Sequence, residues 1–176
     1  SSLKAKKSWF TFPDAVAALG TGISSSEGKS TETIVDNRKA MENAENTVWI
    51  DGLEADLTTG EPASASMNWA LLEGNNGESQ NIGYYFPGGD QTVSVRKGRN
   101  AGDWSLIGTS KGEALETYLE MWFDHGANPE NEAYEYVLLP GLSAEETEAY
   151  SKEPGITILK NTPEIQAAAT ADGLLT

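Results

Sequence analysis

The stretch EALETYLEMWFD, residues Glu113–Asp124, decides the fold class of this chain. Its residues alternate between two faces over five consecutive pairs, a pattern that predicts a β-strand with one buried face. That face would carry Leu115, Thr117, Leu119, Met121 and Phe123. A helix is the competing interpretation, because Leu115, Leu119 and Trp122 also recur at helical spacing. The alternation and the aromatic content favour the strand.

Short β-branched or aromatic runs continue on both sides of this stretch. We expect further strands at 7–12, 15–23, 31–37, 47–50, 67–72, 82–86, 92–96, 103–107, 134–139 and 156–159. Turn sequences separate them, among them Asp51-Gly52, Asn75-Asn76-Gly77, Pro87-Gly88-Gly89-Asp90, Gly126-Ala127-Asn128-Pro129 and Pro154-Gly155. Many short strands without long helices between them predict an all-β fold, an antiparallel multi-stranded β-sandwich.

One short helix is expected after the last long strand. Ser143 and Glu146 form a capping-box sequence, in which each side chain satisfies the backbone N–H of the other residue. The helix would run for about two turns to Tyr150 or Ser151 and end before Pro154. No repeat, heptad or linker divides the 176 residues, a length that suits one domain or a large part of one.

Composition excludes several classes of function. The chain has 27 Asp and Glu against 12 Lys and Arg, a formal net charge of −15, which opposes binding to nucleic acid or anionic lipid. Without cysteine there are no disulfides, thiol nucleophiles or Cys-based zinc sites, and a single histidine excludes multi-His metal sites. No apolar run approaches the about 20 residues that a membrane-spanning helix needs.

His125 is the one candidate imidazole base, and Asp124 beside it could orient the ring. Neighbouring residues of a strand point to opposite faces, however, so these two side chains are not expected to pair. A histidine just before a glycine turn is more often hydrogen-bonded to the backbone, so a structural role is favoured over catalysis.

Two groups of polar residues are candidate ligand sites. Asp51, Glu54 and Asp56 flank a turn and could hold calcium, although their spacing is not that of an EF-hand and an acidic chain produces such clusters by chance. The run Asp36-Asn37-Arg38-Lys39 could contact a ligand, but the polar end of a strand is the favoured interpretation. Gly20-Thr21-Gly22 and Gly88-Gly89 match no phosphate-binding motif and open no helix.

The basic and aromatic residues also have a structural and a binding interpretation. Lys4 and Lys6 would share one face of a strand, near Lys7, and either meet an anionic polymer or protect a sheet edge, the favoured role. The tryptophans could stack on sugar rings, but each lies in an apolar run, so about four of the five are expected in the core: Trp9, Trp49, Trp69, Trp104 and Trp122. Residue chemistry alone therefore gives an acidic β-sandwich without a catalytic constellation.

Five segments, in order, resemble one family. KKSWF at Lys6–Phe10 with ALGTGI at Ala18–Ile23 is similar to the KKSWF…ALGxGI segment of family 8 polysaccharide lyases, the hyaluronate, chondroitin AC and xanthan lyases. The others are ETIVDNR at Glu32–Arg38, NIGYYFP at Asn81–Pro87, WFDHG at Trp122–Gly126 followed by YEYVLLP at Tyr134–Pro140, and ILKNTPEIQA at Ile158–Ala167. The chain departs from the family pattern at Asp103–Gly108 and matches it less clearly over residues 51–65.

The resemblance implies a secreted enzyme with an N-terminal helical toroid and a β super-sandwich. Such lyases cleave uronic-acid-containing polysaccharide by β-elimination, with an Asn, a Tyr, a His and an Arg that lie mainly on the toroid. No residue of this chain matches those motifs, and His125 is not the family's catalytic histidine, so we expect no catalytic, cofactor-binding or metal residue here, with calcium at the acidic cluster a remote alternative.

Residues 1–176 are therefore expected to be part of the super-sandwich, structural and flanking the cleft. Ser1–Lys4 resembles no signal peptide, and the chain is expected to be a processed or excised piece, with an open edge and an exposed apolar face. Its partners would be the remaining domains of the lyase and the anionic polysaccharide, whether hyaluronan, chondroitin or xanthan. The alternative is a stand-alone carbohydrate-binding or adhesion β-sandwich without chemistry.

Overall fold

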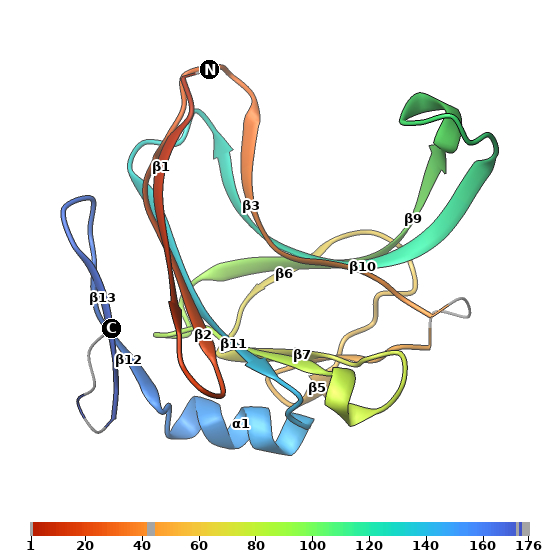
Figure 1. The fold of residues 1–176 in the computed structure, drawn as a ribbon. Coiled ribbons are helices and arrows are strands. Elements are labelled where there is room, and N and C mark those ends of the chain that lie inside the picture. Colours follow the sequence, from red (N-terminus) through yellow and green to blue (C-terminus); the bar gives the residue numbers. More distant parts are fainter. Residues whose placement is uncertain (1, 42–44, 172, 174–176) are drawn as a thin grey trace.

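Over residues 2–41, 45–171 and 173, which the computed structural model describes, the chain folds into three antiparallel sheets and one α-helix (Figure 1). The predicted all-β sandwich is confirmed. Two of the sheets form the sandwich, and the third is a hairpin beside it.

The larger sheet has seven strands in the order β1-β2-β11-β8-β7-β4-β5. Their bounds are β1 Lys4–Thr11, β2 Val16–Ser24, β11 Glu132–Pro140, β8 Ile82–Tyr85, β7 Trp69–Leu72, β4 Val48–Ile50 and β5 Leu53–Glu54. Strand β2 reads VAALGTGIS and is buried along most of its length, because both of its faces are covered.

The smaller sheet has four strands in the order β3-β10-β9-β6. Their bounds are β3 Ser30–Lys39, β10 Glu113–Ala127, β9 Thr92–Asp103 and β6 Ala63–Ser66. The stretch that decided the fold class is thus a strand, β10, and the helical interpretation is wrong.

The main core fills the space between the two sheets. From β10 it receives Leu119, Met121 and Phe123, which meet Tyr84 of β8 and Tyr136 of β11. Since side chains alternate along a strand, Tyr118, Glu120 and Trp122 of β10 point away from this core. We call the surface on which they lie the outer face of the four-stranded sheet.

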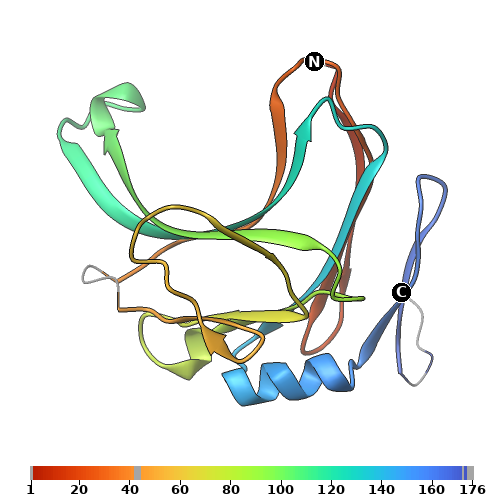
Figure 2. The ribbon, with the colours of Figure 1, turned by 180° about the vertical axis from the view of Figure 1, so that it is seen from behind.

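Strands β9 and β10 continue beyond the sandwich as a long hairpin, which stands away from the seven-stranded sheet in both ribbon views (Figures 1 and 2). Leu115 lies on this extension and is exposed, so the predicted buried face of Glu113–Asp124 holds only from Leu119 onward. The predicted strand at residues 103–107 is also wrong. A 3₁₀ turn, Trp104–Leu106, forms there because Asp103 Oδ1 accepts a hydrogen bond from Ser105 N at 2.8 Å and caps the turn.

A second apolar cluster covers the other face of the seven-stranded sheet. It joins Ala17 and Val137 to residues of helix α1, Ala144–Lys152, and of the hairpin β12, Ile156–Asn161, with β13, Gln166–Thr170. The helix and its capping box are confirmed: Glu146 N donates to Ser143 Oγ, and Ser143 N donates to Glu146 Oε2. A second 3₁₀ turn, Glu78–Gln80, precedes β8.

Candidate functional site

His125 lies near the end of β10 and does not form an acid–base pair with Asp124. Its Nε2 shares a hydrogen bond of 2.8 Å with Thr33 Oγ1 on β3, so its partner is a side chain rather than the predicted backbone group. Asp124 instead accepts from Gly126 N at 2.8 Å and from Ser30 Oγ at 3.4 Å. Burial lowers the pKa of His125, which leaves the ring neutral at neutral pH.

A ladder of aromatic rings lies beside His125 between the two sheets. Phe123 stacks on Tyr134 with centroids 5.4 Å apart, and Tyr134 stacks on Tyr136 at 5.9 Å. Burial raises the pKa of Tyr134 and brings that of Tyr136 to about 12, so neither phenol is a base at neutral pH. The ladder is core packing with polar edges, and it provides no general base.

The run Asp36–Lys39 forms the end of β3, as the favoured interpretation predicted. Asp36 accepts a hydrogen bond from the buried Tyr84 hydroxyl and forms an ion pair with Arg38 Nε at 3.1 Å. Arg38 also donates to Gln80 O at 3.3 Å, so its guanidinium joins β3 to the 3₁₀ turn that precedes β8. These contacts hold the strand end in place.

The acidic cluster does not converge on one point. Asp51 accepts from the backbone N–H of Asn68 and Trp69 at 3.0–3.1 Å, and Asp56 accepts from Thr58 N and Oγ1. Among the residues that the structure describes, no group of three or more His, Cys, Asp or Glu could hold a metal ion, this cluster with Glu54 included. The calcium alternative therefore has no support in the geometry.

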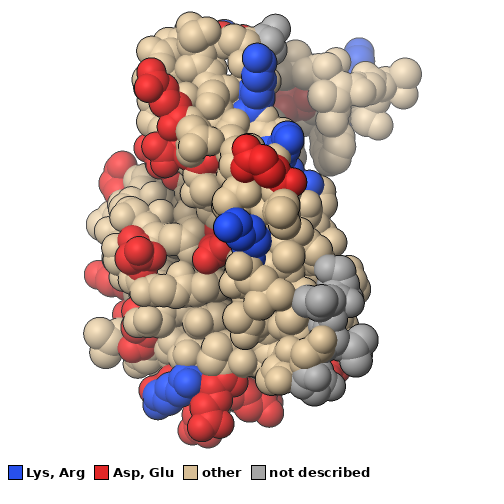
Figure 3. Space-filling view, turned by 90° about the vertical axis from the view of Figure 1, so that its left-hand side faces the viewer, with Lys and Arg blue, Asp and Glu red and all other residues tan. Residues whose placement is uncertain are grey.

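The three lysines of β1 do not form one basic patch. Lys6 Nζ donates to Pro163 O at 2.6 Å, on the side of the β12–β13 hairpin, whereas Lys7 Nζ lies 5.7 Å from the centre of the Tyr134 ring, on the side of the main core. The side of the molecule that carries β1 and this hairpin shows separate blue and red groups among tan atoms, without a continuous basic surface (Figure 3). β1 is the edge strand of its sheet, as the favoured role of Lys4 and Lys6 requires.

The tryptophans are mostly not in the core, which corrects the expectation for four of the five. Only Trp69 is buried, at 3% exposure, while Trp49 and Trp122 are partly buried. Trp9 lies on the edge strand β1 and is 63% exposed, and Trp104 lies at the tip of the β9–β10 hairpin and is 53% exposed. An apolar run in the sequence therefore does not ensure that a tryptophan is buried. The prediction fails where the strand is at the edge of its sheet or extends beyond the sandwich.

The glycine pairs serve packing and turns. Gly20 lies in β2 against Tyr134, and a Cβ at this position would overlap the tyrosine ring. Gly88 and Gly89 have φ of 81° and 65° in the turn after β8. In the described part of the chain, neither glycine pair is followed by a helix that starts there.

The outer face of the four-stranded sheet carries a polar network. Glu120 of β10 accepts from Arg96 Nε of β9 at 2.7 Å and from Asn100 Nδ2 at 3.2 Å. Lys39 at the end of β3 forms an ion pair with Glu116 Oε1 at 2.8 Å. The two β10 carboxylates are thus neutralised by cations of the neighbouring strands.

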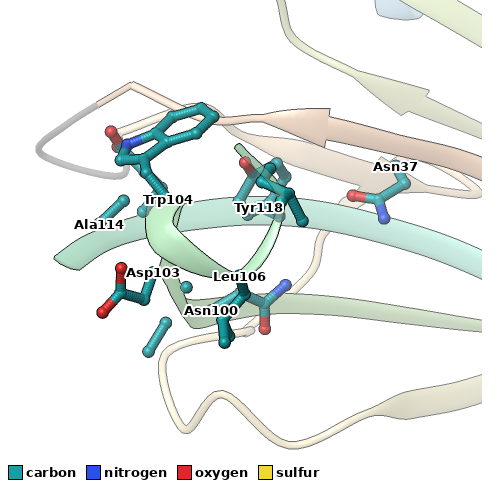
Figure 4. Close-up of a pocket in the computed structure, with 11 residues that line it drawn as sticks. Asn37, Asn100, Asp103, Trp104, Leu106, Ala114 and Tyr118 are labelled. Carbon is teal, nitrogen blue, oxygen red and sulfur yellow. The ribbon is translucent and has the colours of Figure 1, made fainter. Parts of the chain in front are cut away.

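Beside this network lies a hollow of about 460 Å³, which we call the hairpin trough (Figure 4). Its lining includes Asn37 from β3, Asn100 from β9, Tyr118 from β10, and Asp103, Trp104 and Leu106 from the hairpin tip. In Figure 4 Tyr118 lies between Trp104 and Asn37. From the sequence, Asn37 and Trp104 had a ligand contact as their less favoured interpretation, but no pattern joined them. The polar residues of the trough come from three strands, and only the register of those strands brings them together.

Comparison with known proteins gives consistent results. Residues 1–151 match the family model described as polysaccharide lyase family 8, super-sandwich domain. Xanthan lyase from Bacillus sp. (strain GL1) is 40% identical over 173 residues, which are 94% of this chain and 18% of that protein. Hyaluronate lyase from Thermasporomyces composti is 31% identical over 95% of this chain and 21% of that protein.

A solved structure of Paenibacillus xanthan lyase superposes with a TM-score of 0.92 at 37% identity, over 97% of this chain and 17% of that one. The chain thus spans about a fifth of the length of the relatives that it matches. No helix in the described part of the chain is long and apolar enough to cross a membrane.

Proposed function

Because this chain belongs to polysaccharide lyase family 8, in which it matches the super-sandwich domain, we propose that it is part of a larger secreted lyase that cleaves uronic-acid-containing polysaccharide by β-elimination. In that reaction a base removes the C5 proton of the uronate, the C4–O bond breaks, and the leaving oxygen takes up a proton. The product carries a C4–C5 double bond.

Residues 1–176 would be one portion of the super-sandwich, with a structural role beside the cleft. The observation that carries this proposal is the family match over residues 1–151 together with the surroundings of His125. That imidazole is hydrogen-bonded to Thr33, and its ring centre lies 6.3 Å from that of Tyr134, so it holds two strands together. No carboxylate among the described residues is hydrogen-bonded to it. The reacting groups would therefore lie on other parts of the enzyme.

The charge of the chain agrees with this division of roles. A formal charge of −15 makes the segment a poor surface for a polyanion, so the cationic part of the cleft would lie on another domain. Exposed apolar side chains outside the trough, Leu53 at 75% and Ile34 at 55%, give those domains surfaces to pack against. The remaining domains of the lyase and the polysaccharide are the proposed partners.

The test is an assay of the complete enzyme that contains this chain, with hyaluronan, chondroitin and xanthan as substrates. We expect cleavage of at least one polymer to produce the ultraviolet absorbance of an unsaturated uronate. New reducing ends without that absorbance would show a hydrolase. Binding without cleavage of any of the three polymers would favour the stand-alone carbohydrate-binding module.

A further inference from the structure

The hairpin trough has the size and the aromatic lining of a small-molecule site. Its volume of about 460 Å³ falls in the roughly 300–1,000 Å³ range of ligand pockets. Trp104 leaves half of its surface in solvent at the end of a hairpin, and Tyr118 contributes a second ring from β10. Exposed indole and phenol faces are suited to the apolar C–H face of a sugar ring, because they are apolar on the face and polar at the edge.

The backbone holds Trp104 in place before any ligand arrives. Asp103 Oδ1 caps the 3₁₀ turn through Ser105 N, and Trp104 N donates to Gly112 O at 3.1 Å across the hairpin. Gly108 N and Ile107 N then donate back to Trp104 O. Because these hydrogen bonds fix the backbone of the turn, less conformational entropy is lost when a ligand binds to Trp104 than on a mobile loop. The turn is therefore preorganised for binding.

The polar groups of the trough have unused hydrogen-bonding capacity. The Asn37 amide, the Trp104 indole N–H and the Tyr118 hydroxyl have no hydrogen-bond partner among the described residues. Asn100 donates through Nδ2 to Glu120, which fixes the plane of its amide and leaves its Oδ1 free to accept. Two amides, an indole N–H and a phenol offer both donors and acceptors, which are the partners that hydroxyl groups need.

The charges select against an anion. Asp103 and Glu116 are the charged residues of the trough lining, and Glu116 forms an ion pair with Lys39 at 2.8 Å, whereas no ion pair joins Asp103 to a described residue. The hydrogen bond from Ser105 lowers the pKa of Asp103, which therefore stays ionised. A uronate carboxylate placed here would meet a net negative charge, whereas the hydroxyl groups of an uncharged ring would not.

We infer that the hairpin trough is a carbohydrate subsite that binds a neutral pyranose residue of the polysaccharide, stacked on Trp104 and hydrogen-bonded by Asn37 and Asn100. The uronates of the polymer would then be bound elsewhere in the enzyme. The inference rests on the proposed function only for the identity of the polymer.

The test is an NMR titration of the ¹⁵N-labelled chain with cellotriose and chitotriose as neutral probes and trigalacturonate as the anionic probe. We expect a neutral trisaccharide to shift the side-chain amide signals of Asn37 and Asn100 and the indole signal of Trp104. Trp104→Ala should weaken this binding by about tenfold or more. Asn37→Ala should weaken it by about fivefold. Trp9→Ala, which removes an exposed tryptophan outside the trough, should leave it unchanged.

A second readout uses the complete enzyme and does not depend on the stability of the isolated chain. Trp104→Ala should raise KM for the polymer with little change in kcat, because the subsite binds a residue that does not react. Three results would overturn the inference. The first is that the NMR signals of Asn37, Asn100 and Trp104 respond to no trisaccharide. The second is that they respond to trigalacturonate at a lower concentration than to the neutral trisaccharides, and the third is an unchanged KM in Trp104→Ala. The first would assign the tip to protein docking. Since the unsaturated product is detected independently, the subsite can fail while the lyase assignment stands.

Discussion

Gly20 shows how a single residue sets the packing of the main core. Its position on β2 lies directly under the ring of Tyr134, which in turn stacks on Phe123 and Tyr136. The missing side chain therefore allows the aromatic ladder to approach the sheet closely.

Gly20→Ala should lower the free energy of unfolding by about 2 kcal/mol, because the added methyl forces the Tyr134 ring to move in a filled core. Gly102→Ala is the matched control, a strand glycine of β9 with open space at its Cβ position, and should change stability by less than about 0.5 kcal/mol. Urea denaturation of both variants measures the difference. An equal decrease in the free energy of unfolding of the two variants would mean that the close contact between Gly20 and Tyr134 does not contribute to stability.

His125 makes the stability of the fold depend on pH. Burial holds its pKa below the ordinary value of 6.5, against the opposing effect of the carboxylates of Glu132 and Asp124. The unfolded chain therefore takes up a proton at higher pH than the folded chain does. The stability contributed by this residue is complete above about pH 6.5 and is lost as the pH falls toward the folded pKa.

We expect His125→Gln to lose less stability than the parent chain between about pH 7.5 and about pH 5.5, since it has no imidazole to protonate. Denaturant midpoints at the two pH values give the comparison. Burial raises the pKa of Glu135, which acts with the opposite sign, so the difference between the parent and the variant isolates the histidine. Identical pH dependence of the two chains would contradict this account.

At this scale the sequence predicted the chemistry of single residues better than their burial. The structural role of His125 and the separation of its side chain from Asp124 followed from strand geometry. The exposure of Trp9 and Trp104 did not, because it depends on where each strand lies in the sheet, which local composition does not encode. Tyr118 gave no local signal, whereas Asn37 lies in the run Asp36–Lys39, for which a ligand contact was the less favoured interpretation.

Among the elements, strand β10 and helix α1 were the most predictable. Both carry a complete local pattern: the alternation of β10 and the capping box of α1. Strands β5, β6 and β13 were missed, since they are two to five residues long, and the last two are made mainly of Ala and Ser. These segments are strands because they pair with β4, β9 and β12, and not because their own residues have a high β-propensity.

The capping box is expected to contribute measurably to the fold, because α1 is short and packs on β7 and β8. Ser143→Ala removes the acceptor of the Glu146 N–H and should lower the free energy of unfolding by about 1 kcal/mol. Glu145→Gln in the same first turn, outside the box, should cost less than about half of that. Thermal unfolding followed by circular dichroism compares them, and an equal effect of the two substitutions would mean that the box has no specific role.

For the whole molecule, the sequence predicted a sandwich but not its shape. The long β9–β10 hairpin and its exposed tip arise because these two strands extend past the sheet that faces them. The sequence of residues 92–127 does not indicate where that facing sheet ends. The family resemblance was confirmed by the match over residues 1–151 and by the structural similarity. The trough could not be predicted, because it is formed by residues of three strands that only their pairing register brings together.

The central claim is that this chain belongs to a lyase whose reacting groups lie on other parts of the enzyme. The most direct measurement compares the purified 176-residue chain with the complete enzyme under identical conditions, by the absorbance of unsaturated uronate released from hyaluronan, chondroitin and xanthan. The account predicts product from the complete enzyme and none from the folded chain at the same molar concentration. Sustained release of unsaturated product by the chain alone would contradict it.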